Sequence, residues 1–150
     1  MLDLLLEHRD ELFGFLKGQW GKLFEAKYDV LLYDLTSTYF ESEPPPPDAV
    51  SKKRFGYSRD KRSDCVQVVV ALVLTPEGFP VAYEVYPGNT RDTATLGEFL
   101  DRIEKQYGKF RRTWLMDRGI PTEEMLEKMR ERGIDYLVGT PKGHLTRVEK

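Results

Sequence analysis

The sequence predicts an α/β fold built on one mixed β-sheet. Five segments are rich in β-branched and aromatic residues and are predicted to be strands, and two amphipathic helices separate the last three of them. A short turn joins the second strand to the third, so this pair should be antiparallel, whereas strands joined through a helix are usually parallel. With 150 residues, 40% of them apolar, the chain is long enough for one domain with its own core.

Residues 1–27 are predicted to form a helical lead-in, the remnant of an upstream helical region. Apolar residues recur near helical spacing between positions 2 and 24. Gly14, Gly18 and Gly21 interrupt this pattern, and each glycine costs up to about 1 kcal/mol in a helix interior. We therefore expect one broken helix or two short ones.

The second predicted unit, residues 28–150, begins with a strand and a long insertion. Residues 28–36 are apolar and β-prone, whereas residues 37–64 are polar and contain four consecutive prolines at positions 44–47. Proline lacks the amide hydrogen that helices and sheet ladders use, so it favours an extended segment. We expect residues 37–64 to form an insertion outside the sheet.

A β-hairpin should follow this insertion. Residues 65–74 are almost continuously apolar, and residues 81–86 form the next β-prone run. Pro76-Glu77-Gly78 between them has the composition of a turn, and Pro87-Gly88-Asn89 ends the second strand. The two runs are therefore predicted to pair antiparallel.

The clearest helical pattern spans residues 93–107. Thr95 is followed three residues later by Glu98, a spacing that can form a capping box and start the helix slightly later. The apolar positions that recur with helical spacing are Leu96, Phe99, Leu100, Ile103 and Tyr107.

The last three predicted elements define the topology. Residues 113–117 form a short strand, Thr122 should cap a helix that ends at Gly133, and residues 135–140 form the last strand. The resulting order is strand, strand, strand, helix, strand, helix, strand. This order is typical of a ribonuclease-H-like core, in which the first and fourth strands are neighbours.

Composition excludes several classes of protein. Cys65 is the only cysteine and His8 and His144 are the only histidines, so neither a disulfide framework nor a Cys/His zinc site is expected. No run of eighteen apolar residues is present, and acidic residues interrupt the apolar N-terminal stretch. We expect a cytoplasmic protein with no membrane partner and a buried core thiol at Cys65.

A basic segment lies inside the predicted insertion. Phe55 and Tyr57 are interleaved with it, and Asp60 is its only acidic residue. Such a segment suits a phosphate backbone with aromatic contacts nearby, although a solvated basic loop would have the same composition. The basic residues are Lys52, Lys53, Arg54, Arg59, Lys61 and Arg62.

Two aspartates stand at positions that the predicted topology brings together. Asp34 interrupts an apolar strand, and Asp117 ends the strand that should lie beside it. A carboxylate in a buried strand is costly unless it is paired or holds a metal. Two converging carboxylates would form an oxygen-ligand site of the kind that Mg²⁺ or Mn²⁺ accepts.

Each aspartate also has a purely structural interpretation. Asp34 could support a local turn by hydrogen bonding to Thr36 or Ser37, and Asp117 could accept hydrogen bonds from the amides that follow it. For each aspartate alone, the sequence supports the structural and the functional interpretation equally well. The placement of both aspartates at positions that the predicted topology brings together favours the metal site.

The residues around both acids resemble those of insertion-sequence DDE transposases, in the group called insertion-sequence family four. Asp34 lies in a segment similar to the first-acid signature of that family, and Asp117 in one similar to its second-acid signature. The resemblance runs from about residue 28 to the end of the chain. The similar segments are Tyr33-Asp34-Leu35-Thr36-Ser37-Thr38, Phe55-Gly56-Tyr57-Ser58-Arg59-Asp60-Lys61-Arg62, Gly78-Phe79-Pro80, Pro87-Gly88-Asn89-Thr90, Asp117-Arg118-Gly119 and Tyr136-Leu137-Val138-Gly139-Thr140-Pro141.

The resemblance implies metal-dependent DNA strand cleavage and strand transfer. Asp34 and Asp117 would hold Mg²⁺ or Mn²⁺ ions that serve the attacking and leaving oxygens of an in-line displacement. Thr36, Arg118 and the basic segment would contact DNA phosphates, although Arg118 could equally form a structural salt bridge. The expected partners are transposon and target DNA and a homo-oligomer, with no small-molecule substrate.

The chain also departs from the family pattern. The third acid of the family belongs to a Tyr-x-x-Arg-x-x-x-Glu helix, and Glu149, two residues after Arg147, has the wrong spacing. We therefore expect a core that is truncated before its final helix, has weak or absent activity alone and exposes apolar surface. The alternative is a non-catalytic remnant that binds DNA or a full-length transposase. A host nuclease of the same fold is a weaker option.

Overall fold

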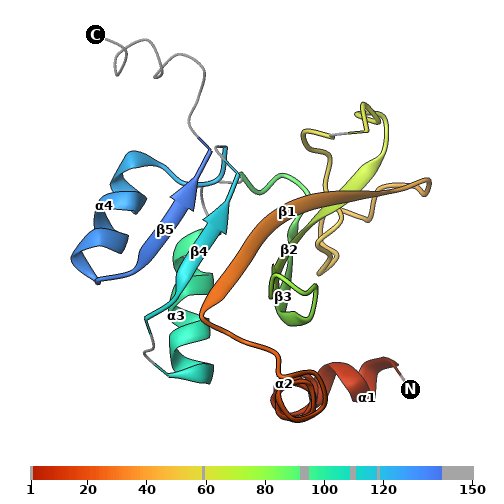
Figure 1. The fold of residues 1–150 in the computed structure, drawn as a ribbon. Helices are drawn as coiled ribbons and strands as arrows, with labels where there is room; N and C mark the ends of the chain where they lie inside the picture. Colours follow the sequence, from red (N-terminus) through yellow and green to blue (C-terminus); the bar gives the residue numbers. More distant parts are fainter. Residues whose placement is uncertain (1, 59, 92–94, 109–110, 118, 140–150) are drawn as a thin grey trace, which may run out of the picture.

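The computed structural model describes residues 2–58, 60–91, 95–108, 111–117 and 119–139. A sheet occupies the middle of this arrangement, with α3 and α4 beside it and α1 and α2 near the start of β1 (Figure 1). In chain order the elements are α1 (Leu2–Glu7), α2 (Arg9–Phe24), β1 (Val30–Phe40), β2 (Val66–Leu74), β3 (Pro80–Pro87), α3 (Leu96–Tyr107), β4 (Thr113–Met116), α4 (Glu123–Glu131) and β5 (Asp135–Val138).

The sheet is mixed and has the strand order β3-β2-β1-β4-β5. β1, β2 and β3 pair antiparallel, whereas β4 pairs parallel with both β1 and β5. The first and fourth strands are therefore neighbours, as the ribonuclease-H-like order requires. The predicted fold class and the predicted hairpin are confirmed.

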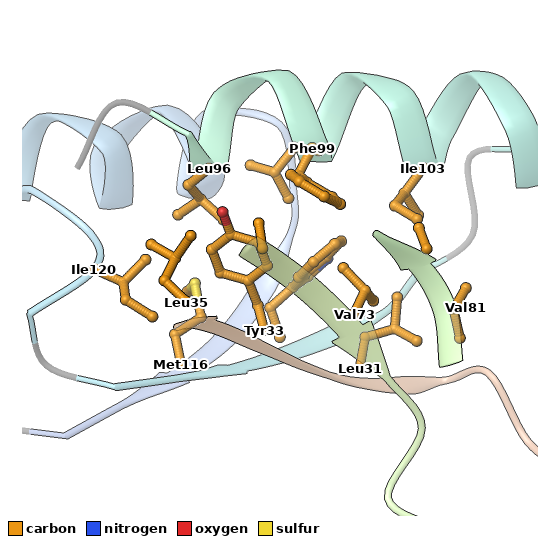
Figure 2. Packing of buried hydrophobic residues seen from close by; sticks show 14 of the residues in the cluster. Leu31, Tyr33, Leu35, Val73, Val81, Leu96, Phe99, Ile103, Met116 and Ile120 are labelled. Carbon is orange, nitrogen blue, oxygen red and sulfur yellow. The ribbon is translucent and has the colours of Figure 1, made fainter. Parts of the chain in front are cut away.

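One face of the sheet carries the hydrophobic core. Side chains alternate between the two faces of a strand, and on β1 the buried members are Leu31, Tyr33 and Leu35. Helix α3 lies over this face and packs Leu96, Phe99, Leu100 and Ile103 against it (Figure 2). Helix α4 adds Met129 to the same cluster.

The N-terminal segment folds as two helices, but the break lies at His8, and Gly14, Gly18 and Gly21, which were expected to interrupt the helix, all lie inside the continuous α2. No residue of α2 is buried, yet its aromatic side chains contact β3 and the residue before it. Trp20 stacks on Phe79 with ring centroids 5.3 Å apart, and Phe13 lies 5.8 Å from Tyr83. No helix among the described residues has the length and apolarity needed to cross a membrane.

The strand that carries Asp34 is longer than predicted. We expected it to end at residue 36 and the insertion to begin at 37, but β1 continues to Phe40. Thr38, Tyr39 and Phe40 pair with the first three residues of β2. Their β-branched and aromatic side chains suit a strand, so the polar serine and threonines between them do not end it.

The helix boundaries follow local chemistry. Helix α3 begins after Thr95, which agrees with the later of the two predicted starts. The Thr95 hydroxyl does not cap the helix, however, and instead accepts a hydrogen bond from the Tyr33 hydroxyl at 2.8 Å. At α4 the Thr122 hydroxyl does cap, accepting from the Met125 amide at 3.2 Å. Gly133 follows that helix with φ +68°, the left-handed conformation expected of a stop.

Candidate functional site

Asp34 lies on β1 and Asp117 directly follows β4, so the fold places them at equivalent positions of two adjacent parallel strands. Tyr33 of β1 pairs with Met116 of β4, so each aspartate follows a paired residue. Tyr33 and Met116 point into the core, and alternation turns both aspartates to the opposite face. Neighbouring strands lie about 4.8 Å apart. The two carboxylates therefore share one end of the parallel part of the sheet.

Both aspartates line an open cavity of about 690 Å³ on the face of the sheet away from α3. This location corrects one expectation, because both side chains are exposed rather than buried inside an apolar strand. The strand is covered on one face alone, so Asp34 keeps contact with solvent. The remaining lining residues are Leu32, Tyr33, Leu115, Met116, Leu137, Val138 and Gly139.

Residues 30–40 form a continuous strand, so the local turn that the structural interpretation of Asp34 requires is not present there. Asp34 lies in the middle of β1, where no turn exists, and Ser37 points to the other face of the sheet. The Ser37 hydroxyl is buried and has no hydrogen-bond partner among the described residues. After β4, the Ile120 amide donates to the main-chain oxygen of Asp117 at 3.1 Å, which closes a turn. This turn follows the strand end that presents Asp117.

The donor set suits a hard divalent cation. Asp34 and Asp117 provide carboxylate oxygens, which Mg²⁺ and Mn²⁺ prefer over nitrogen or sulfur ligands. Within the described ranges, no group of three or more Asp, Glu, His or Cys side chains is placed to hold a metal. Thr36 is exposed on the same face, two residues beyond Asp34. The site thus offers two carboxylates with a hydroxyl nearby.

The predicted basic segment does not form one uniform surface. The Lys52 ammonium lies 3.6 Å from Glu84, whereas the Arg62 guanidinium binds Glu41 at 2.7 Å and Asp64 at 3.0 Å. The hydrogen bond from Arg62 lowers the pKa of Asp64 to about 2. Arg62 is therefore already neutralised by carboxylates.

The other predicted phosphate-contacting residues differ in their placement. Lys61 is exposed and has φ +59°. Lys53 and Arg54 lie beside the start of β2, where Arg54 forms an antiparallel bridge with Gln67. Arg59 and Arg118 fall outside the described residues.

Sequence reasoning missed the apolar floor of the cavity. Leu32, Leu115 and Leu137 pair across β1, β4 and β5 and form a row next to the two aspartates. Leu137 exposes 65% of its surface. The alternation of side chains along each strand could have revealed this row. Leu32 and Leu115 each lie two residues before an aspartate and therefore share its face of the sheet.

A protein-family model matches most of the chain. The family model described as "Transposase DDE domain" matches residues 25–147. No match was found among curated proteins.

Three solved structures illustrate what the chain resembles in shape. The Mos1 transposase paired-end complex with left transposon end has a TM-score of 0.49 at 14% identity, over 87% of this chain and 41% of that chain. The piggyBac transposase synaptic complex with hairpin DNA has a TM-score of 0.49 at 11% identity, over 81% and 26%. The simian T-cell lymphotropic virus intasome with PP2A regulatory subunit B56 gamma has a TM-score of 0.45 at 11% identity, over 81% and 38%.

The chain covers less than half the length of each of these three solved chains. The family assignment comes from the domain match, which extends over most of the sequence and includes β1, β4 and both aspartates. The chain therefore belongs to the transposase DDE domain family.

Proposed function

We propose that this chain forms part of the catalytic core of a DNA transposase in which Asp34 and Asp117 hold divalent cations for DNA strand cleavage and strand transfer. The observation that supports this proposal is the pairing of β1 with β4, which brings two carboxylates 83 positions apart in sequence to one cavity. The open side of that cavity leaves room for a phosphate group above the two aspartates.

The chain's own residues would bind and orient the substrate. Bound Mg²⁺ or Mn²⁺ would supply activation of the attacking hydroxyl and charge stabilisation at the leaving oxygen. Thr36 lies on the face that carries Asp34, where its hydroxyl can donate a hydrogen bond to a phosphate oxygen. Lys53 and Arg54 offer positive charge to the DNA backbone.

A metal titration tests the site directly. We expect Mn²⁺ to give a saturable heat signal by isothermal titration calorimetry with the wild-type protein, and a much smaller one with Asp34→Asn/Asp117→Asn. The substitutions keep the shape of both side chains but remove the charge that a divalent cation requires. Asp48→Asn, which alters an exposed acid in the proline-rich insertion, is the matched control and should titrate like the wild type.

The alternative function, a domain that binds DNA without cutting it, is supported by the donor count. Asp34 and Asp117 are the only acids among the residues that line the described cavity.

Incubating a supercoiled plasmid with the protein and Mn²⁺ separates the two functions. Nicking that disappears in the double aspartate variant indicates the enzyme, whereas DNA binding without nicking indicates the non-catalytic domain. Equal heats from the wild-type and double-variant proteins would rule out the metal site altogether.

A further inference from the structure

A short loop, residues 52–57, lies against the ends of β2 and β3; we call it the basic–aromatic loop. Its sequence, Lys-Lys-Arg-Phe-Gly-Tyr, has three positive charges and no acid. Two backbone hydrogen bonds tie Arg54 to Gln67, one in each direction, at 2.9 and 3.0 Å. The Gly88 amide also donates to the Lys52 oxygen at 3.0 Å. The loop is therefore held to the sheet by backbone contacts.

A buried glutamine fixes the second half of this loop. Gln67 is 1% exposed, and its side-chain amide donates to the main-chain oxygens of Tyr57 (2.9 Å) and Gly88 (2.8 Å). Gly56 packs so closely on this support that a Cβ there would lie 2.0 Å from the Gly88 oxygen. The backbone that presents Phe55 and Tyr57 is thus held in place on both sides of Gly56.

The two aromatic rings of the loop are nevertheless exposed. Phe55 exposes 52% of its surface and Tyr57 exposes 89%. Two nearby rings on β1 instead each have a cation over them. The Lys53 ammonium lies 4.3 Å from the Phe40 ring, and the Arg62 guanidinium lies 4.9 Å from the Tyr39 ring. Large apolar side chains that a fixed backbone holds in solvent are typical of a binding surface.

We propose that Phe55 and Tyr57 stack on unpaired bases of DNA while Lys53 and Arg54 contact the adjoining phosphates. This inference rests on the proposed function, because it takes DNA to be the partner. Aromatic rings beside basic side chains form the usual platform for single-stranded nucleic acid, since every base offers a flat face for stacking. A platform that is already fixed loses little conformational entropy on binding.

The position of the loop relates it to the two aspartates. Gln67, which anchors the loop, pairs with Tyr39, five residues along β1 from Asp34. At about 3.4 Å per strand residue this separation is roughly 17 Å. The residue that anchors the loop and the strand residue Asp34 therefore belong to the same pair of strands, β2 and β1.

Binding to three fluorescently labelled DNAs of one sequence tests the inference: a single strand, a blunt duplex and a duplex with an unpaired end. We expect Tyr57→Ala and Phe55→Ala each to weaken binding of the single strand and the open-ended duplex about 5-fold to 150-fold, the range typical of one lost base stack. Binding to the blunt duplex should change less than twofold. Phe15→Ala, which removes an equally exposed ring from α2, is the matched control and should leave all three affinities unchanged.

A second variant reports stacking itself. In Tyr57→Trp the new indole should retain binding, and its fluorescence, measured as the difference from the wild type, should be quenched by the single strand but not by the blunt duplex. Three results together would overturn this inference alone: the wild-type protein binds DNA, both alanine variants bind it with the same affinity as the wild type, and no DNA quenches the Tyr57→Trp fluorescence. A wild-type protein that binds none of the three DNAs would overturn the proposed function as well.

Discussion

At the scale of single residues, two glycines far apart in sequence determine how the insertion meets the sheet. A Cβ on Gly56 would lie 2.0 Å from the Gly88 oxygen, and one on Gly88 would lie 2.1 Å from the Gln67 oxygen. Both obstructing atoms belong to the backbone, so a side-chain rotation cannot relieve either clash. Each position therefore requires glycine because of packing.

We predict that Gly56→Ala and Gly88→Ala each destabilise the protein by about 1–3 kcal/mol, the usual cost of an overpacked site. Gly14→Ala is the matched control, because a Cβ there meets nothing within 4 Å. Gly14 lies inside α2, where alanine should stabilise the helix by up to about 1 kcal/mol. Urea denaturation of the three variants measures these changes. Destabilisation of the same size in all three would contradict the packing argument.

The environments of single residues were only partly predictable from the sequence. The predicted strand order correctly made Asp34 and Asp117 neighbours. Their exposure to solvent was not predicted, because the apolar run around Asp34 suggested a strand covered on both faces. The contact between Gly56 and Gly88 could not be predicted from local sequence. It depends on the register of β2 with β3 and on the path of the insertion.

At the scale of elements, hydrogen bonds between side chains and backbone connect α3 to the sheet. The Tyr107 hydroxyl, at the end of α3, donates to the Val81 oxygen on β3 at 2.9 Å. Burial, the largest cause, raises the pKa of Tyr107 from 10.0 to about 12. The folded protein therefore favours the protonated phenol, and this contribution to stability is present below pH 10 and lost as the pH rises towards 12.

Tyr107→Phe tests this connection through its pH dependence. At pH 8 the variant should be about 1 kcal/mol less stable than the wild type, the usual net value of one hydrogen bond. The difference should shrink between pH 10 and pH 12, because in this range Tyr107 ionises in the unfolded wild type but stays protonated in the folded protein, which favours unfolding, whereas phenylalanine has no proton to lose. Urea denaturation at several pH values measures it, and the other tyrosines contribute equally to both proteins. A difference that stays constant up to pH 12 would show that the Tyr107 proton is not linked to folding.

Elements with a clear periodic pattern were predicted well, and elements that depend on pairing were not. The 3.6-residue pattern identified α3, and the sequence that begins with Thr122 and ends with Gly133 bounded α4. The far end of β1 was missed, because Thr38–Phe40 becomes a strand only by pairing with β2. The near-continuous apolar run of β2 also concealed that alternate residues are only half-buried on the open face.

At the scale of the whole molecule, the two faces of the sheet differ. Helices α3 and α4 cover one face, whereas the cavity and its leucine row open on the other. The row of Leu32, Leu115 and Leu137 lies directly beside Asp34 and Asp117 on this face. An apolar row beside charged residues is typical of a surface that another molecule covers.

We predict that two copies of this chain associate through the open face as protein concentration rises. Leu137→Lys should reduce the association measured by sedimentation velocity, because it places a charge in the leucine row. Its folding stability should change by less than about 0.5 kcal/mol, since Leu137 is 65% exposed. Leu23→Lys, at a 70% exposed position on α2, is the matched control and should associate like the wild type. If the wild type remains monomeric, or if both lysine variants lose association equally, the open face is not the contact surface. Selective loss in Leu137→Lys would place a second copy next to the two aspartates, where it would compete with DNA for the same cavity.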